Sequence, residues 1–157
     1  MGAMTITVDT ASADALFDGI VADSEAAARP AAQAMAQVFV DEVRRNVARL
    51  GRRTGNLAAS IYQAHSERLS TPQRQVYQVS WNPRKAPHGH LVEFGYMQRY
   101  EVSFDPVTKR FTTHKDRPLP APRHVGAKPF VRPALSKTEQ AVAAGKAEYL
   151  RRLGAKP

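Results

Sequence analysis

Apolar and polar positions follow their most regular pattern between residues 31 and 50. Apolar side chains recur there at steps of three and four, which places them along one side of a helix. They are Ala31, Met35, Val38, Phe39, Val43 with its neighbour Glu42, Val47 and Leu50. The opposite side carries Gln33, Gln37, Asp41, Arg44, Arg45 and Arg49. Because Gly51 is a suitable end, the pattern predicts a long amphipathic helix over this stretch.

Two shorter elements are predicted before this helix. Residues 5–10 alternate and fit a short strand. An alanine-rich stretch then follows Ser12, which is a plausible N-cap. Its apolar side consists of Leu16, Phe17, Ile20 and Val21. Since proline is tolerated in the first turn of a helix but breaks its interior, we predict a short helix to about residue 28 and a separate helix from Pro30.

A single helical turn and a β-hairpin are predicted after Gly51. Thr54 or Asn56 can cap the turn through a side-chain oxygen. Residues 61–66 and 74–81 then indicate strands, the second by strict alternation of its two faces. The segment 70–73 (Ser-Thr-Pro-Gln) supplies the turn between them. An antiparallel hairpin is therefore expected here.

A second hairpin and an extended arm are predicted in the next third of the chain. Residues 90–95 form a short buried element whose type the pattern leaves open. Residues 98–104 and 109–114 alternate, and the segment 105–108 (Asp-Pro-Val-Thr) makes the turn that joins them. Residues 115–129 hold four of the eleven prolines and no strong periodicity. We therefore expect them to form an extended arm without packed regular structure.

The C-terminal part of the chain predicts a final helix. Arg132 and Pro133 open it, since proline suits a first helical turn, and Gly154 ends it after Leu153. The residues expected to contact the body are Ala134, Leu135, Ala141 with Val142, Tyr149 and Leu150.

These elements predict an α+β fold. We expect a single antiparallel sheet made of both hairpins, packed by the long helix and the C-terminal helix, with an extended arm. Residues 1–4 resemble a cloning scar, and residues 5–30 form an acidic N-terminal segment. Residues 31–157 are expected to form one α+β domain, in which the hairpin and arm at 97–129 are basic.

The formal net charge of +9 is unevenly distributed. Residues 1–30 hold five acidic residues and one basic residue, a net of −4, whereas residues 31–157 hold 22 basic and nine acidic residues, a net of +13. Three interpretations stay open. The basic body faces nucleic acid, the acidic segment docks on the basic body of a neighbouring copy, or the charges form an ordinary solvated surface.

The basic residues best placed to contact DNA or a neighbouring protein lie in predicted loops and the second hairpin. Side chains there can reach phosphates, which bind Lys and Arg without any reading of the base sequence. No helix-turn-helix, zinc-finger or RNP pattern occurs, so sequence-specific binding is not expected. The candidate residues are Arg84, Lys85, Lys109, Arg110, Lys115 and Arg117.

Nothing in the sequence supports catalysis. The absence of cysteine excludes disulfides, thiolate metal sites and cysteine nucleophiles. No zincin, nucleophile-elbow, Walker or dinucleotide-binding motif occurs. His88 and His90, with Glu93 nearby, suggest a metal site, but a solvated loop is the better interpretation of this histidine pair. We therefore predict no catalytic residue, metal or cofactor, and no membrane span, since no apolar run approaches roughly 18 residues.

Three stretches, taken in order, carry a resemblance to a phage family. They are Arg53-Thr54-Gly55-Asn56-Leu57-Ala58-Ala59-Ser60-Ile61, Pro87-His88-Gly89-His90-Leu91-Val92-Glu93-Phe94-Gly95 and Ala127-Lys128-Pro129-Phe130-Val131-Arg132-Pro133-Ala134-Leu135. This pattern resembles the minor tail component family of long-tailed phages and prophages, which includes tail-completion and head–tail joining proteins. The resemblance covers roughly residues 31–150, and the segments 5–28 and 97–126 depart from the family pattern.

The resemblance assigns fold and interface roles to particular residues. Gly95 would let the chain turn after a buried Phe94, and Phe130 would anchor the arm to the core before Pro133 starts the last helix. The full set is Thr54, Gly55, Asn56, Leu57, Glu93, Phe94, Gly95, Pro129, Phe130, Arg132 and Pro133.

The resemblance also implies a structural virion protein at the head–tail junction, assembled in the host cytoplasm. Its partners would be copies of itself in a ring, commonly sixfold, and the neighbouring connector and tail tube or terminator proteins. Phage DNA would pass through the lumen of the ring without sequence-specific contact. The alternative function is a nonspecific nucleic-acid-binding module.

Overall fold

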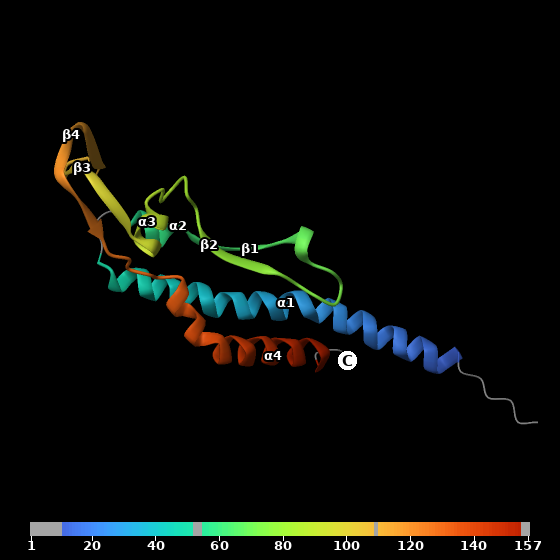
Figure 1. Ribbon diagram of the computed structural model, residues 1–157. Helices are drawn as coiled ribbons and strands as arrows, with labels where there is room; N and C mark the ends of the chain where they lie inside the picture. Colours follow the sequence, from blue (N-terminus) through green and yellow to red (C-terminus); the bar gives the residue numbers. More distant parts are fainter. Residues whose placement is uncertain (1–10, 52–54, 109, 155–157) are drawn as a thin grey trace, which may run out of the picture.

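The computed structural model describes residues 11–51, 55–108 and 110–154, with the backbone alone for residues 11–17. The predicted strand at 5–10 and the candidate residues Thr54 and Lys109 lie outside the described residues. The elements confirm the α+β fold class: helices at both ends of the chain enclose two β-hairpins (Figure 1).

One continuous helix, α1 (Ala11–Arg49), replaces the two helices predicted on either side of Pro30. The prediction of a break was wrong because tertiary packing continues across the proline. Ala27 and Ala31, on the two sides of Pro30, are 1% and 9% exposed. Gly51, at φ 86°, follows the helix, and this left-handed conformation suits glycine.

The C-terminal segment forms the 3₁₀ helix η2 (Arg132–Lys137) and then the helix α4 (Thr138–Gly154), which lies side by side with α1 (Figure 1). The two helices approach closely at Gly145, where an added Cβ would overlap the side chain of Met35. Ala134 and Ala141 are buried as predicted. Leu135, Val142 and Leu150 were expected to contact the body, but they are 67%, 50% and 55% exposed.

The first predicted hairpin is confirmed and lies along α1 on the side away from α4 (Figure 1). The short helix α2 (Asn56–Ser60) leads into β1 (Ile61–His65), and the 3₁₀ helix η1 (Glu67–Leu69) precedes β2 (Tyr77–Trp81). The antiparallel register pairs Ile61 with Trp81 and His65 with Tyr77. Helix α1 is thus covered by α4 on one side and by β1 and β2 on the other.

The second hairpin is longer than predicted. After the short helix α3 (Gly89–Phe94), strand β3 (Tyr96–Asp105) pairs with β4 (Arg110–Val125). Most of the segment predicted as an arm is therefore strand. The prolines of β4 at 118, 120 and 122 fall at alternate positions. Because alternate residues of a strand direct their N–H groups to the same edge, the missing donors can all face the edge that β3 does not pair.

The two hairpins do not join into the predicted single sheet. They form two separate two-stranded sheets, β1 with β2 and β3 with β4. Helix α3 and the turn at Gly95 separate β2 from β3, and the second hairpin projects from the body at the end of the molecule where α1 finishes (Figure 1). Alternation predicts strands but does not state which strand edges meet, so the sequence pattern could not distinguish these arrangements.

Candidate functional site

The three motif segments converge on one hydrophobic core beside the C-terminal half of α1. Side chains from all three surround this core: Leu57 and Ala58 from the first segment, Val92 from the second and Val131 from the third pack against it. The buried members of the cluster are Val40, Val43, Val47, Ile61, Phe130 and Ala134. Segments separated by dozens of residues in the sequence therefore share a single packing site.

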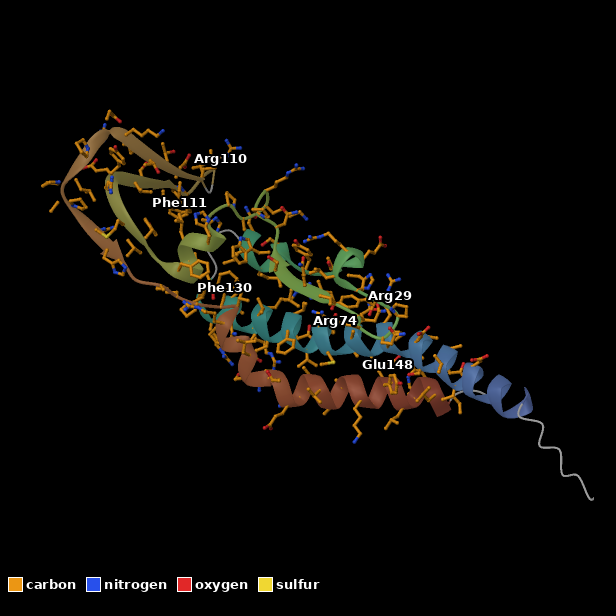
Figure 2. All side chains as sticks on the ribbon, turned by 45° about the vertical axis from the view of Figure 1, so that its right-hand side comes forward. Arg29, Arg74, Arg110, Phe111, Phe130 and Glu148 are labelled. Atoms are coloured by element: carbon orange, nitrogen blue, oxygen red, sulfur yellow. The ribbon has the colours of Figure 1, made fainter. Side chains whose placement is uncertain are left out.

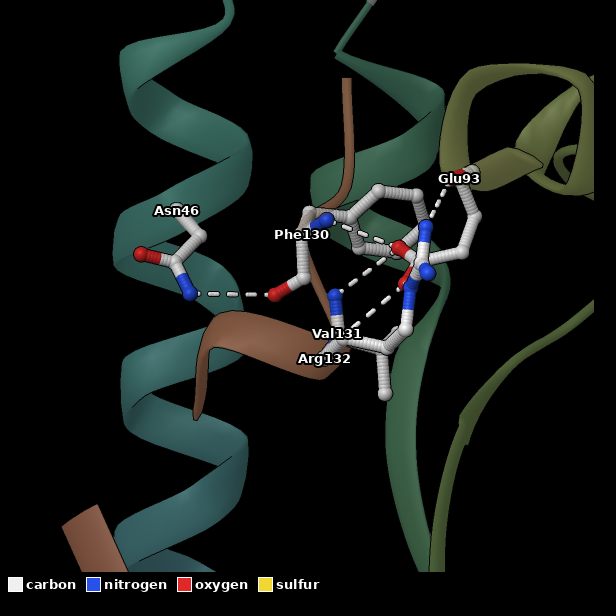
Figure 3. Close-up of polar contacts among 5 residues, drawn as sticks. All are labelled: Asn46, Glu93, Phe130, Val131 and Arg132. Atoms are coloured by element: carbon white, nitrogen blue, oxygen red, sulfur yellow. Dashed lines mark hydrogen bonds and ion pairs between the residues drawn. The ribbon is translucent and has the colours of Figure 1, made fainter. Parts of the chain in front are cut away.

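The place where the three motif segments meet is called the junction here. The carboxylate of Glu93 lies at its centre and is 2% exposed. Its Oε2 accepts the backbone N–H groups of Phe130 at 2.7 Å and Val131 at 2.9 Å, and its Oε1 accepts that of Arg132 at 3.2 Å (Figure 3). Burial raises the pKa of Glu93, but these backbone bonds and the Arg132 side chain outweigh it and hold the pKa below 4.5. The charged carboxylate thus binds the free N–H groups where η2 begins.

Arg132 and Asn46 complete this polar network. The Arg132 Nε lies 3.3 Å from Glu93 Oε1, and its Nη2 donates to the Glu93 carbonyl at 3.2 Å. Asn46 is 7% exposed and donates from Nδ2 to the carbonyl of Phe130 at 3.0 Å. The backbone of Phe130 is therefore held on both sides, by Asn46 of α1 and by Glu93 of α3 (Figure 3).

Phe94 does not occupy the buried position that was predicted for it. It is 64% exposed, and the Arg132 guanidinium lies over its ring at 5.5 Å from the centroid. The buried aromatic residue of the junction is Phe130, at 0% exposure, which packs edge-on against Trp81 with 5.6 Å between ring centroids. The prediction failed because α3 directs Glu93 inward, which leaves the adjacent Phe94 on the outer side.

Two glycines make the close approaches that this junction needs. Gly95 has φ 75° and ψ 174°, and an added Cβ would lie 2.7 Å from the carbonyl oxygen of Val125. Gly89 faces the indole of Trp81, which a Cβ there would overlap. The Lys128 N–H donates to the carbonyl of Val92 at 2.8 Å, so the two ends of the second hairpin are joined at its base.

The remaining motif residues lie around this junction or outside the described part of the chain. Gly55 is the N-cap of α2 with φ 79° and makes no side-chain cap bond, and Asn56 is the first residue of that helix. Pro129 is exposed next to Phe130, and Pro133 occupies the first turn of η2. Thr54 lies outside the described residues, so its predicted capping role is untested.

Sequence reasoning missed Asn46 and the polar role of Glu93. A signal for Asn46 was present, because it lies three residues after Val43 on the apolar side of α1, where a buried polar group needs a partner. The partners of Glu93 are 37 to 39 residues away in the sequence, and no local pattern could connect them.

The second hairpin projects from this junction and is bent. The register between β3 and β4 shifts between Gln98 and Tyr100 and again between Tyr100 and Glu101. The buried amide of Gln98 fixes the base of the hairpin, since its Oε1 accepts from Arg123 Nε at 2.9 Å. Beyond the bend the large apolar side chains are exposed: Val102 by 40%, Phe104 by 38%, Phe111 by 50% and Val107 by 89%.

The candidate basic residues are divided between two places. Arg84 and Lys85 are exposed in the loop before α3, where their backbone N–H groups donate to Asn82 Oδ1. Arg110 begins β4 near the end of the hairpin, beside Phe111 (Figure 2). Further along β4, Lys115 is exposed, and Arg117 lies 3.7 Å from Glu101 and 3.8 Å from Asp116. Lys109 lies outside the described residues.

The alternative metal site at His88, His90 and Glu93 does not form. Both carboxylate oxygens of Glu93 face the N–H groups of residues 130–132. Burial lowers the pKa of His88, and the charge of His90 lowers it further. Within the described part of the chain, no three His, Asp or Glu residues are arranged to hold a metal ion.

Comparison with known proteins identifies the class to which this fold belongs, the structural components of phage tails. Residues 17–95 match the model of the HK97-gp10-like family, described as "Bacteriophage HK97-gp10, putative tail-component". This match spans half of the chain and includes most of α1, the first hairpin and the Glu93 segment, so the chain belongs to that family. No curated protein and no solved structure gives a significant match. None of the helices described here is long and apolar enough to cross a membrane.

Proposed function

We propose that this tail component acts in the neck, as a tail-completion protein that forms a ring between the head connector and the tail tube. The observation that carries the proposal is the β3–β4 hairpin, which projects from the body with several large apolar side chains exposed. A two-stranded hairpin is marginally stable on its own in water, so it needs a protein surface to pack against. A subunit of a closed assembly supplies such a surface.

A ring also explains the rigid junction at the base of the hairpin. Glu93 binds the chain that follows the hairpin to α3, and the Gln98–Arg123 bond joins β3 to β4 at the base. A projecting element that is fixed at its base meets a neighbour at a defined angle, and repeated contacts at one angle give a ring when the rotation between subunits closes. Because the chain resembles tail-completion proteins, we expect a sixfold ring with six copies.

The basic residues of the loop and hairpin are proposed to face either phage DNA in the lumen of the ring or a neighbouring protein. DNA contact of this kind is made with phosphates and does not depend on base sequence. The protein would have no catalytic role and would need no metal or cofactor. It would reach the virion from the host cytoplasm, where the neck is assembled.

Immunogold electron microscopy of particles that contain the full-length chain tests this proposal. Gold at the head–tail junction is the expected result and would leave only the layer within the neck to be determined. Gold along the tail tube or at the distal tip would keep the protein in the tail but remove the neck role. Particles without gold would overturn the structural function.

The alternative is a nonspecific nucleic-acid-binding module, which the net charge of +13 over residues 31–157 favours. It predicts affinity for duplex DNA that falls by about 0.9 log units per log unit of salt for each phosphate contact. The absence of binding at low salt would remove it. Within the proposed ring, charge reversal of Arg110, Lys115 and Arg117 separates contacts between subunits from contacts with DNA in the lumen. Loss of DNA retention with intact head–tail joining would favour the lumen.

A further inference from the structure

A shallow groove lies at the end of the molecule opposite to the hairpin. It is enclosed by the N-terminal half of α1, the turn before β2 and the C-terminal half of α4, and its volume is about 360 Å³. Ile20, Val21 and Tyr149 supply its apolar lining, and Ile20 and Val21 are 55% and 54% exposed. Pockets of small ligands start at roughly 300 Å³, so this groove has room for one or two large side chains.

The α1 side of this groove carries carboxylates, and the exposed Arg29 and Arg74 lie next to its lining residues Ala28 and Gln73. Glu25 lines the groove directly, and Asp18 is exposed two helical turns before it on the same stripe of α1 as Val21. Glu25 is oriented by Gln73, whose Nε2 donates to Glu25 Oε1 at 2.8 Å. Ser24 and Tyr149 share a hydroxyl hydrogen bond of 2.5 Å, which ties α1 to α4 at the groove. The groove thus combines an apolar floor with carboxylates at its margin.

The distal half of the hairpin has the complementary character. Phe104 and Phe111 are cross-strand partners with ring centroids 4.8 Å apart, and Val107 stands 89% exposed at the turn. Arg110 precedes Phe111 in β4 (Figure 2) and is the cross-strand partner of Asp105. Residues 96–125 carry six basic and three acidic residues, a net of +3, whereas residues 11–29 carry four acidic residues and one basic residue, a net of −3.

We infer that the distal hairpin of one copy, with Phe104, Val107 and Phe111, docks in the groove between α1 and α4 of the next copy. The inference rests on the proposed ring and supplies its subunit contact. Apolar side chains fill the groove, and Arg110 approaches the margin formed by Asp18 and Glu25. The opposite net charges of the hairpin and the N-terminal half of α1 steer the docking, whereas two basic hairpins repel each other.

The positions of the two surfaces determine the kind of assembly. The hairpin and the N-terminal half of α1 lie at opposite ends of an elongated molecule (Figure 1). A contact between different surfaces is heterologous, so each subunit contributes its hairpin to one neighbour and its groove to another. Such a contact continues from copy to copy, and it closes into a ring when the rotation between neighbouring copies divides a full turn. A twofold contact between identical surfaces would instead stop at a dimer.

Crosslinking in assembled particles tests this contact. The chain has no cysteine, so within this protein a short bis-maleimide reacts only with thiols introduced by substitution. The double variant Val107→Cys/Val21→Cys should give a ladder of covalent multimers on a denaturing gel. Each single variant should give none. The matched control Val107→Cys/Leu135→Cys places the second thiol at an apolar residue that is 67% exposed but remote from the groove, and it should also give no ladder.

A charge exchange tests the same contact without cysteines and covers the case in which the thiol variants do not assemble. Arg110→Glu and Glu25→Arg should each lower the yield of joined particles by roughly tenfold, since each places like charges at the contact. The double variant should recover most of that yield. A double variant no better than Arg110→Glu alone would overturn the inference.

These outcomes separate the contact from the proposed function. Gold at the head–tail junction with no ladder, or with a band at the dimer alone, overturns the docking of hairpin in groove and leaves the neck role standing. Absence of the protein from particles overturns both. A ladder from the double variant, together with recovery in the charge exchange, supports the contact.

Discussion

The carboxylate of Glu93 accepts the backbone N–H of Phe130 at 2.7 Å across 37 residues of sequence. This bond joins α3 to the start of η2 and lies next to the aromatic pair of Phe130 and Trp81. It connects the second and third motif segments at one buried point. The projecting hairpin begins and ends beside this bond, so the stability of the body and the direction of the hairpin depend on the same junction.

Replacement of Glu93 with glutamine should destabilise the fold by roughly 2–4 kcal/mol. Both carboxylate oxygens of Glu93 now accept backbone N–H groups. Glutamine has nearly the same size, but only one of its two terminal atoms is an acceptor, and its NH₂ group would face an N–H donor. Urea unfolding at neutral pH measures the change. The control is Glu101→Gln, whose side chain is 53% exposed and should change stability by less than about 1 kcal/mol. Equal effects of the two substitutions would contradict the role of Glu93.

The stability of the protein should fall in acid in a way that depends on Glu93. Burial raises the pKa of this carboxyl, but the backbone N–H groups and Arg132 hold it below 4.5 in the folded state. A carboxylate with a lowered folded pKa stabilises the fold above its unfolded pKa, and this contribution is lost as the pH falls through the folded value. The difference in unfolding free energy between wild type and Glu93→Gln should therefore have its full size above pH 4.5 and become smaller below it. A difference that stays constant down to pH 2 would show that the charge of Glu93 does not contribute.

Phe130→Ala should cost about 3–5 kcal/mol, because a fully buried ring leaves a cavity beside Trp81. The matched substitution is Phe111→Ala in the hairpin, where the ring is 50% exposed. It should change the thermal midpoint little and yet reduce the yield of joined particles. Calorimetry with an assembly assay measures both effects. Loss of fold stability at Phe111 or normal assembly of that variant would speak against the separation of core and contact surface.

Gly95→Ala should destabilise the protein by roughly 1–3 kcal/mol, since this backbone region is open essentially to glycine alone. The cause is its φ of 75° together with the 2.7 Å approach that a Cβ would make to the Val125 carbonyl oxygen. Gly126→Ala is the control, because nothing lies within 4 Å of a Cβ at that position. Guanidinium unfolding of the two variants compares them. Similar midpoints for both would mean that the turn after α3 tolerates a side chain.

The sequence by itself determined the elements whose burial follows a local period. The stripe from Ala31 to Leu50 specified a helix and its inner face, because apolar side chains at steps of three and four can be buried together only on one side of a helix. Alternation specified the first hairpin in the same way. The motif segments led to the phage tail component family, which the match over residues 17–95 then showed.

Only the tertiary structure decided which of these elements meet. Packing against α4 carries α1 through Pro30, and pairing with β3 extends β4 through its prolines. The separation of the hairpins, the exposure of Phe94 and the burial of Glu93 arise from contacts between distant segments. A local pattern indicates whether the side chain of a residue is buried. It does not report which distant N–H group or ring lies there, because that choice is made by the packing of the whole chain.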